Sequence, residues 1–307
     1  MLGPSDYASL QGLAFVARRM VQGLFGGAHA SPYSGSGAEF FDYRSYSSGD
    51  EIRQLDWKLF GRTDRLYVRQ YQHLTDLRVY LLVDCTASMN FAAIGARGKG
   101  QEPITKLQYA ATLAAAIAFL TVRQSDRVGL GVYADKLVRH LPTGGTWSHF
   151  QRLCRVLEQV QPILGRGNLG ASLRHAHSLM KRRGLIVLIS DLLDEPHELF
   201  DGLNRLRHDG FEVIVFQVLT PQELDLAAAG PLRLRLVDAE TRRQVRTHLP
   251  QVQRRYAQLM HEHLEAVRRG CVGRGADYNL LITDAGPGPG VIEALRRYLA
   301  RRTAIRR

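Results

Sequence analysis

Short apolar runs alternate with longer amphipathic stretches along the chain from residue 77 onward. The run at 77–84, LRVYLLVD, is nearly continuous in apolar residues, as expected of a strand buried on both faces of a sheet. The segment 103–124 is long and alanine-rich and predicts a helix. Because such alternation is typical of parallel β-α-β units, the sequence predicts an α/β fold with a doubly wound, mostly parallel sheet. Further strands are expected at 126–135, 137–144, 184–191, 211–220 and 278–284, and further helices at 146–160, 168–183, 196–210, 250–269 and from Val291.

The first part of the chain follows a different pattern. Residues 5–25 place their apolar positions near one helical face, which predicts an N-terminal helix. Residues 39–76 mix aromatic and charged side chains without a long period, so we expect short β segments and turns packed on the neighbouring domain. We therefore divide the chain into an N-terminal segment, 1–76, and an α/β domain, 77–307, with a small hairpin insertion near 230–248.

Composition narrows the class of protein. The chain has 307 residues, 45% hydrophobic and 23% charged, and a net charge of +12. Such a charge suits acidic partners. The excess positive charge comes mostly from arginines distributed along the chain, and no recognised nucleic-acid-binding module is present, so we expect no nucleic-acid ligand. Three widely separated cysteines suit a reducing compartment. No apolar stretch reaches the roughly 20 residues needed to span a bilayer, and no export signal is evident. We expect a cytoplasmic protein.

Oxygen-bearing side chains follow the first strand of the predicted domain. Asp84 ends the strand, and Thr86 and Ser88 follow at alternate positions, so that their oxygens converge if the chain stays extended. Asp191 ends a second predicted strand and should lie on the same rim of the sheet. Such oxygens suit a hard cation such as Mg²⁺. The alternative is that the side chains of Asp84, Thr86 and Ser88 bind no metal and only form hydrogen bonds with backbone groups of the turn after the strand.

The five residues at 84–88, DCTAS, resemble the D-x-S/T-x-S motif of the von Willebrand factor A domain, whose metal-ion-dependent adhesion site binds Mg²⁺ or Mn²⁺. The resemblance implies a Rossmann-type A-like fold, with a Thr ligand from a middle loop and an Asp after a later strand. Asp191 matches that Asp. The middle loop resembles 165–173, where Gly167 stands in place of the Thr, so that Asn168 or a water would have to substitute.

Residues 35–72 resemble the signature of the bacterial domain-of-unknown-function family fifty-eight, and the likeness spans about residues 10 to 220. The matching positions are Gly35, Gly37, Glu39, Phe40, Arg44, Tyr46, Gly49, Asp50, Arg53, Asp56, Trp57, Gly61 and Arg62. The resemblance implies a protein that works with a MoxR-type AAA+ ATPase or its client in chaperone-like maturation. No catalytic activity is established for this family.

Charged and aromatic residues of the signature form either a structural ion-pair network or a partner-binding surface: Arg44, Asp50, Arg53, Asp56 and Trp57. The arginine-rich helix expected from Val291 is either a solvated helix end or a patch for an acidic partner or an anionic membrane surface.

These patterns predict a non-enzymatic, metal-dependent adaptor. A metal-free scaffold with the same fold is the alternative. A Mg²⁺-dependent phosphatase is disfavoured, because Thr86 stands where such enzymes on a similar sheet carry a second Asp.

Overall fold

The computed structural model describes residues 37–46, 55–74, 77–93, 104–165, 167–180, 182–229, 233–240 and 243–283. The predicted N-terminal helix at 5–25 and the predicted helix from Val291 lie outside these residues. The described residues divide into two compact units, a smaller one that contains Gly37–Leu77 and a larger one that begins at Arg78.

The smaller unit contains a two-stranded antiparallel ladder. β1 (Gly37–Ser45) pairs with β2 (Tyr67–Leu74), from Gly37 opposite Leu74 to Ser45 opposite Tyr67. Between them lies the short helix α3 (Trp57–Thr63), whose first turn is capped by Asp56 Oδ1, which accepts the Leu59 N–H at 3.0 Å. That this unit packs on the α/β domain stays a prediction.

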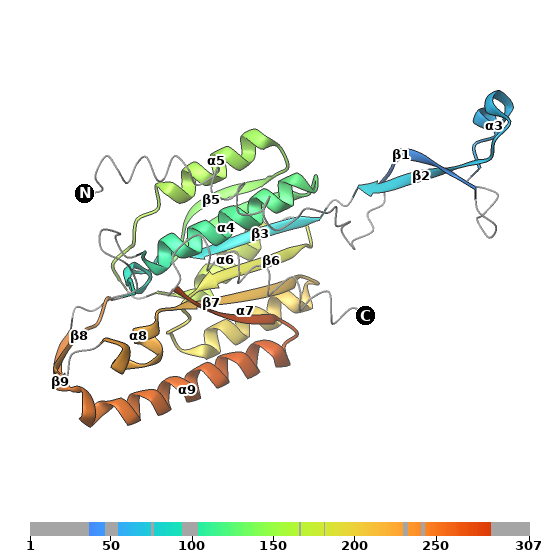
Figure 1. Cartoon of the computed structure of the whole chain (residues 1–307). Coiled ribbons are helices and arrows are strands. Elements are labelled where there is room, and N and C mark those ends of the chain that lie inside the picture. The colour runs from blue at the N-terminus through green and yellow to red at the C-terminus, as the bar shows by residue number, and fades with distance from the viewer. Residues whose placement is uncertain are drawn as a thin grey trace, which may run out of the picture. The chain divides into compact units, whose positions relative to one another are not determined.

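The larger unit is built on a six-stranded sheet in the order β10-β7-β6-β3-β4-β5 (Figure 1). All neighbouring strands are parallel except β5, which pairs antiparallel with β4. The strands are β3 (Arg78–Asp84), β4 (Arg127–Tyr133), β5 (Leu137–Gly144), β6 (Leu185–Ser190), β7 (Glu212–Leu219) and β10 (Asp277–Ile282). The predicted doubly wound, mostly parallel sheet is confirmed.

Helices cover both faces of this sheet. α4 and α5 pack on one face, and α6, α7 and α9 on the other, where they share a core with alternate side chains of β3, β6 and β7. The helices are α4 (Lys106–Arg123), α5 (Trp147–Glu158), α6 (Leu169–Leu179), α7 (Pro196–His208), α8 (Pro221–Leu224) and α9 (Leu249–Gly273). Covering both faces explains why the central strands read as continuous apolar runs rather than as alternating ones.

Helix α4 begins where the sequence supplies a capping box. Thr105 accepts the Gln108 N–H at 3.1 Å, and the Gln108 side chain accepts the Thr105 N–H at 3.0 Å. Its many alanines are buried and let the helix lie close to the strands. This cap fixes the position of Lys106, the first residue of the helix.

The predicted insertion is a hairpin of β8 (Arg233–Val237) and β9 (Gln244–His248), which follows α8 and the 3₁₀ turn η3 (Leu226–Ala229). Figure 1 shows it at the end of the sheet where the parallel strands finish. It joins β7 to the long helix α9.

Candidate functional site

The carboxyl ends of β3 and β6 lie side by side at the centre of the sheet. The strand order reverses at β3, since β4 lies on one side of it and β6 on the other. Asp84 is the last residue of β3, and Asp191 follows Ser190, the last residue of β6. Ligands of open α/β sheets bind at such a reversal, so the two aspartates stand where this architecture places a site.

A turn, rather than extended chain, brings Asp84, Thr86 and Ser88 together. Asp84 Oδ1 accepts the Thr86 N–H at 2.8 Å, and the 3₁₀ helix η2 (Ala87–Asn90) follows at once. Thr86 Oγ1 and Ser88 Oγ lie 3.0 Å apart. The chain does not stay extended here, because the carboxylate accepts the second N–H after it and turns the chain, as in the alternative of a hydrogen-bonded turn. The expected convergence of the oxygens occurs nonetheless.

The loop after β6 holds the other oxygen of Asp84. The Ser190 hydroxyl donates to Asp84 Oδ2 at 2.6 Å and accepts the Leu192 N–H at 3.1 Å. Leu192 adopts a left-handed backbone conformation, φ 49°, and its carbonyl lies 2.7 Å from His263 Nε2 of α9. A non-glycine residue in this conformation is strained, so several contacts combine to fix this loop.

Burial, reinforced by the charge of Asp191, raises the pKa of Asp84 from its ordinary value of 3.8 to about 7. The hydrogen bonds from Ser190 and Thr86 act in the opposite direction without offsetting this rise. A carboxylate held in this way gains from a nearby cation.

A fully buried lysine neutralises Asp191. Lys106 Nζ donates to Asp191 Oδ2 at 2.8 Å and also to Glu223 Oε1 of α8. Burial lowers the pKa of Lys106, but the charges of Asp191 and Glu223 outweigh it and raise this pKa above its ordinary value. Gln217 donates to the Asp191 carbonyl at 2.7 Å. Asp191 therefore lies beside the site as one partner of an ion pair.

The middle loop is held against the end of β3. Ile163 N donates to the Cys85 carbonyl at 2.8 Å, and Asn168 N donates to the Ala134 carbonyl at 3.1 Å. The Asn168 side chain caps α6, since its Oδ1 accepts the Ala171 N–H at 2.8 Å. Asn168 thus has a structural task at the helix start, and its neighbour Gly167 faces the site.

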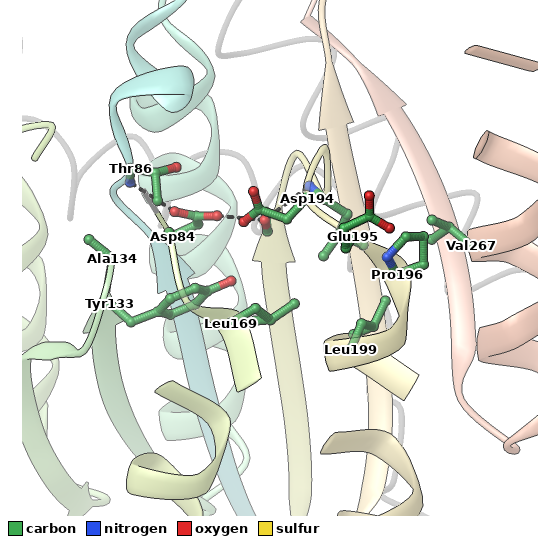
Figure 2. A pocket seen from close by; sticks show the side chains of 13 residues that line it. Asp84, Thr86, Tyr133, Ala134, Leu169, Asp194, Glu195, Pro196, Leu199 and Val267 are labelled. Carbon is green, nitrogen blue, oxygen red and sulfur yellow. Dashed lines mark hydrogen bonds between the residues drawn. The ribbon is translucent and has the colours of Figure 1, made fainter. Parts of the chain in front are cut away.

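Asp84, Thr86, Gly167 and Asp194 line a small common pocket (Figure 2). Its volume is about 10 Å³, enough for about one water-sized particle. Tyr133 also lines it; its buried hydroxyl lies near Ser190 but makes no hydrogen bond of standard geometry within the described part of the chain. A buried hydroxyl in this state calls for a water or ligand in the pocket.

Acidic groups gather at this end of the sheet although the whole chain is basic. Burial, followed by the charges of Asp194, Asp191 and Asp238, raises the pKa of Glu240 in the turn between β8 and β9. The Gly167 N–H bonds to the Glu240 side chain and acts against this rise. The hairpin therefore adds a carboxyl group beside the middle loop.

These oxygens fit a hard cation that accepts hydroxyl ligands. In the described ranges no three His, Cys, Asp or Glu side chains gather closely enough to hold a metal ion by themselves. Any metal ion here would therefore depend on Thr86 and Ser88 as well as on carboxylates. A carboxylate with two hydroxyls and water is a donor set that Mg²⁺ and Mn²⁺ accept.

The predicted partner-binding set is only partly described. Arg44 stands in β1 opposite Val68, whereas Asp50 and Arg53 lie outside the described residues. Asp56 is buried and caps α3, and Trp57 is 59% exposed with its ring edge-on to Phe60. Asp56 thus has a structural role, while Trp57 offers an exposed aromatic surface.

Several residues of this site escape sequence reasoning. Lys106 and Glu223 carry no motif, and their meeting depends on the fold. Tyr133 ends a strand that pairs with β3, opposite Asp84, so the register of the sheet would have been needed to find it. Asp194 has a weak signal, because an acid three residues after Asp191 belongs to the same loop.

The strand order, the antiparallel edge strand and the motif at the end of β3 define a von Willebrand factor A-like domain. Within that class, the chain belongs to the family described as "Protein of unknown function DUF58", whose model matches residues 42–266. This assignment confirms the resemblance of the signature segment.

Similar proteins include Mb1516 of Mycobacterium bovis and Rv1480 of Mycobacterium tuberculosis, each described as an uncharacterized protein. Each is 28% identical over 285 residues, which cover 92% of this chain and 86% of the relative. Among solved structures, BatB from Bacteroides thetaiotaomicron has 16% identity and a TM-score of 0.45, covering 73% of this chain and 98% of that one. The SpRpn10 VWA domain has 12% identity and a TM-score of 0.41, covering 71% and 93%. Among the helices that the structure describes, none is long and apolar enough to cross a membrane.

Proposed function

We propose that this protein is a non-catalytic binding module that holds Mg²⁺ or Mn²⁺ at Asp84, Thr86 and Ser88. The observation that carries the proposal is the convergence of these three side chains beside a pocket whose wall bears the unsatisfied Tyr133 hydroxyl. The bound cation would supply an open coordination position for an acidic side chain of a partner protein. Asp191 would not contact the cation directly. It would support the site through its neighbour Ser190, whose hydroxyl donates to Asp84.

The partner we propose is a MoxR-type AAA+ ATPase or its client. This follows from the family resemblance, and the exposed Trp57 in the signature segment offers it a second contact surface. Interaction with such a protein would place the chain in the cytoplasm.

One observation favours a metal-free scaffold as the second candidate function. Lys106 already neutralises Asp191 from inside the protein, and Gly167 contributes no side-chain ligand. In this alternative the A-like domain binds partners through ordinary surfaces, and the oxygens at 84–88 serve only to shape the turn.

Calorimetric titration of Mg²⁺ and Mn²⁺ into the whole chain, beside Asp84→Ala, separates the two functions. Saturable binding that disappears in the variant supports the metal-dependent module. Equal heats for both proteins would refute the metal-dependent module and favour the metal-free scaffold. Titration of the ATPase with and without EDTA then tests whether partner binding needs the metal.

A further inference from the structure

Gly167 is a glycine for reasons of space and not of backbone conformation. Its φ lies outside the positive range, unlike that of Gly165, Gly210 and Gly275. A Cβ atom at position 167 would lie 2.9 Å from Asp194 Oδ2 and 3.0 Å from Thr86 Cγ2. Real Cβ atoms rarely approach other atoms so closely. The room that a threonine side chain would need is therefore already taken by the Asp194 carboxylate.

We propose that Asp194 supplies the metal ligand that position 167 lacks. In this arrangement a carboxylate from the loop after β6 replaces a hydroxyl from the loop before α6, and it joins Asp84, Thr86 and Ser88 around the cation. Figure 2 shows Asp84, at the end of β3, and Asp194, in the loop after β6, with their carboxylates directed toward each other. The inference rests on the metal-dependent function proposed above.

The chemistry of the pocket is consistent with this exchange. Asp194 lines the same pocket as Asp84 and Thr86, and the buried Tyr133 hydroxyl on its wall indicates a ligand independently of the acids. Lys106 pairs with Asp191, and the acids that line the pocket itself are Asp84, Asp194 and Glu195. Of these, the Asp194 carboxylate lies where a side chain at position 167 would stand. Two carboxylates, from Asp84 and Asp194, match the charge of one divalent cation. We therefore expect the isolated chain to bind metal without a partner's acid.

The test exchanges the two candidate ligand positions. Mn²⁺ is titrated calorimetrically into the whole wild-type chain, Asp194→Ala, Gly167→Thr and the double variant Gly167→Thr/Asp194→Ala. Loss of a ligand in Asp194→Ala should weaken binding at least about tenfold. Gly167→Thr alone should also bind weakly, because the new side chain collides with Asp194. The double variant should recover most of the loss, since the threonine hydroxyl then fills the vacated room.

A matched control removes an equal charge outside the pocket. Asp201→Asn on α7 changes an exposed acid that does not line the pocket and should bind Mn²⁺ nearly as the wild type does. Urea midpoints of all variants check folding. Because Asp194 is exposed, its truncation alone should shift the midpoint little.

The outcomes separate this inference from the function on which it rests. If Asp194→Ala binds like the wild type while Asp84→Ala does not, Asp194 is no ligand but the metal site stands. If Asp201→Asn weakens binding as much as Asp194→Ala, or if the double variant shows no recovery, the effect is one of net charge and the ligand role is lost. If the wild type binds no Mn²⁺, both proposals fall together.

Discussion

Replacing Asp84 by asparagine should stabilise the metal-free protein at alkaline pH. Asp84 is buried, and burial together with the charge of Asp191 raises its pKa from 3.8 to about 7. An acid whose pKa is raised in the folded state binds its proton more tightly there than in the unfolded chain. The free energy of unfolding therefore falls as pH rises from about 4 to about 7, and it stays at the lower level above that.

The size of the effect follows from this pKa. Each pH unit between 3.8 and about 7 corresponds to about 1.4 kcal/mol, so ionised Asp84 lowers the free energy of unfolding by about 4 kcal/mol at pH 8. Asparagine does not ionise and escapes this loss. Its oxygen can still accept the Thr86 N–H, but its amide faces Ser190, whose hydroxyl must then accept. A charge-assisted hydrogen bond is thereby lost, at about 1.5–3 kcal/mol. We expect a net gain of about 1–3 kcal/mol for Asp84→Asn at pH 8.

Urea unfolding in EDTA at pH 5 and pH 8, followed by circular dichroism, measures this difference. The gain of Asp84→Asn should be present at pH 8 and disappear at pH 5, where Asp84 is protonated. Asp201→Asn on α7, which changes an exposed aspartate, should stay within about 0.5 kcal/mol of the wild type at both values. Excess Mn²⁺ should stabilise the wild type and leave Asp84→Asn unchanged. A loss of stability at pH 8, or a gain independent of pH, would refute the reasoning.

Three further predictions concern the site and its support. Lys106→Met should lower the free energy of unfolding by about 3–5 kcal/mol in urea titrations, because it leaves the buried Asp191 and the partly buried Glu223 without their cation; an unchanged midpoint would contradict the buried ion pair. Gly270→Ala in α9 should cost about 1–3 kcal/mol, since its Cβ would lie 2.0 Å from the Phe200 ring. Gly273→Ala serves as its control: a Cβ at position 273 would have no neighbour within 4 Å, so this change should be neutral or slightly stabilising in the same urea titrations. Mn²⁺ affinity should fall about tenfold per pH unit below pH 7 in calorimetry, because a proton competes for Asp84; a flat profile would argue against Asp84 as the titrating ligand.

The sequence by itself determined the architecture and the core of the site. Buried strands and amphipathic helices are specified by neighbouring residues, so the pattern of apolar positions predicted the sheet, its flanking helices and the β8–β9 hairpin. Asp84, Thr86 and Ser88 are likewise close in sequence, and their convergence needed only a strand end and a turn. The sequence left open whether these residues stay extended or form a turn, because this depends on which N–H the Asp84 carboxylate accepts.

Only the tertiary structure decided what surrounds those oxygens. The sequence showed Gly167 as a missing ligand, whereas the structure shows its space filled by Asp194, 27 residues further along the chain. Lys106 carries no sequence motif, yet it is fully buried and pairs with Asp191 and Glu223, which lie 85 and 117 residues away. Burial, and with it the raised pKa of Asp84, arises from the packing of distant segments. No local pattern encodes such packing, because it depends on which strand ends the sheet brings together.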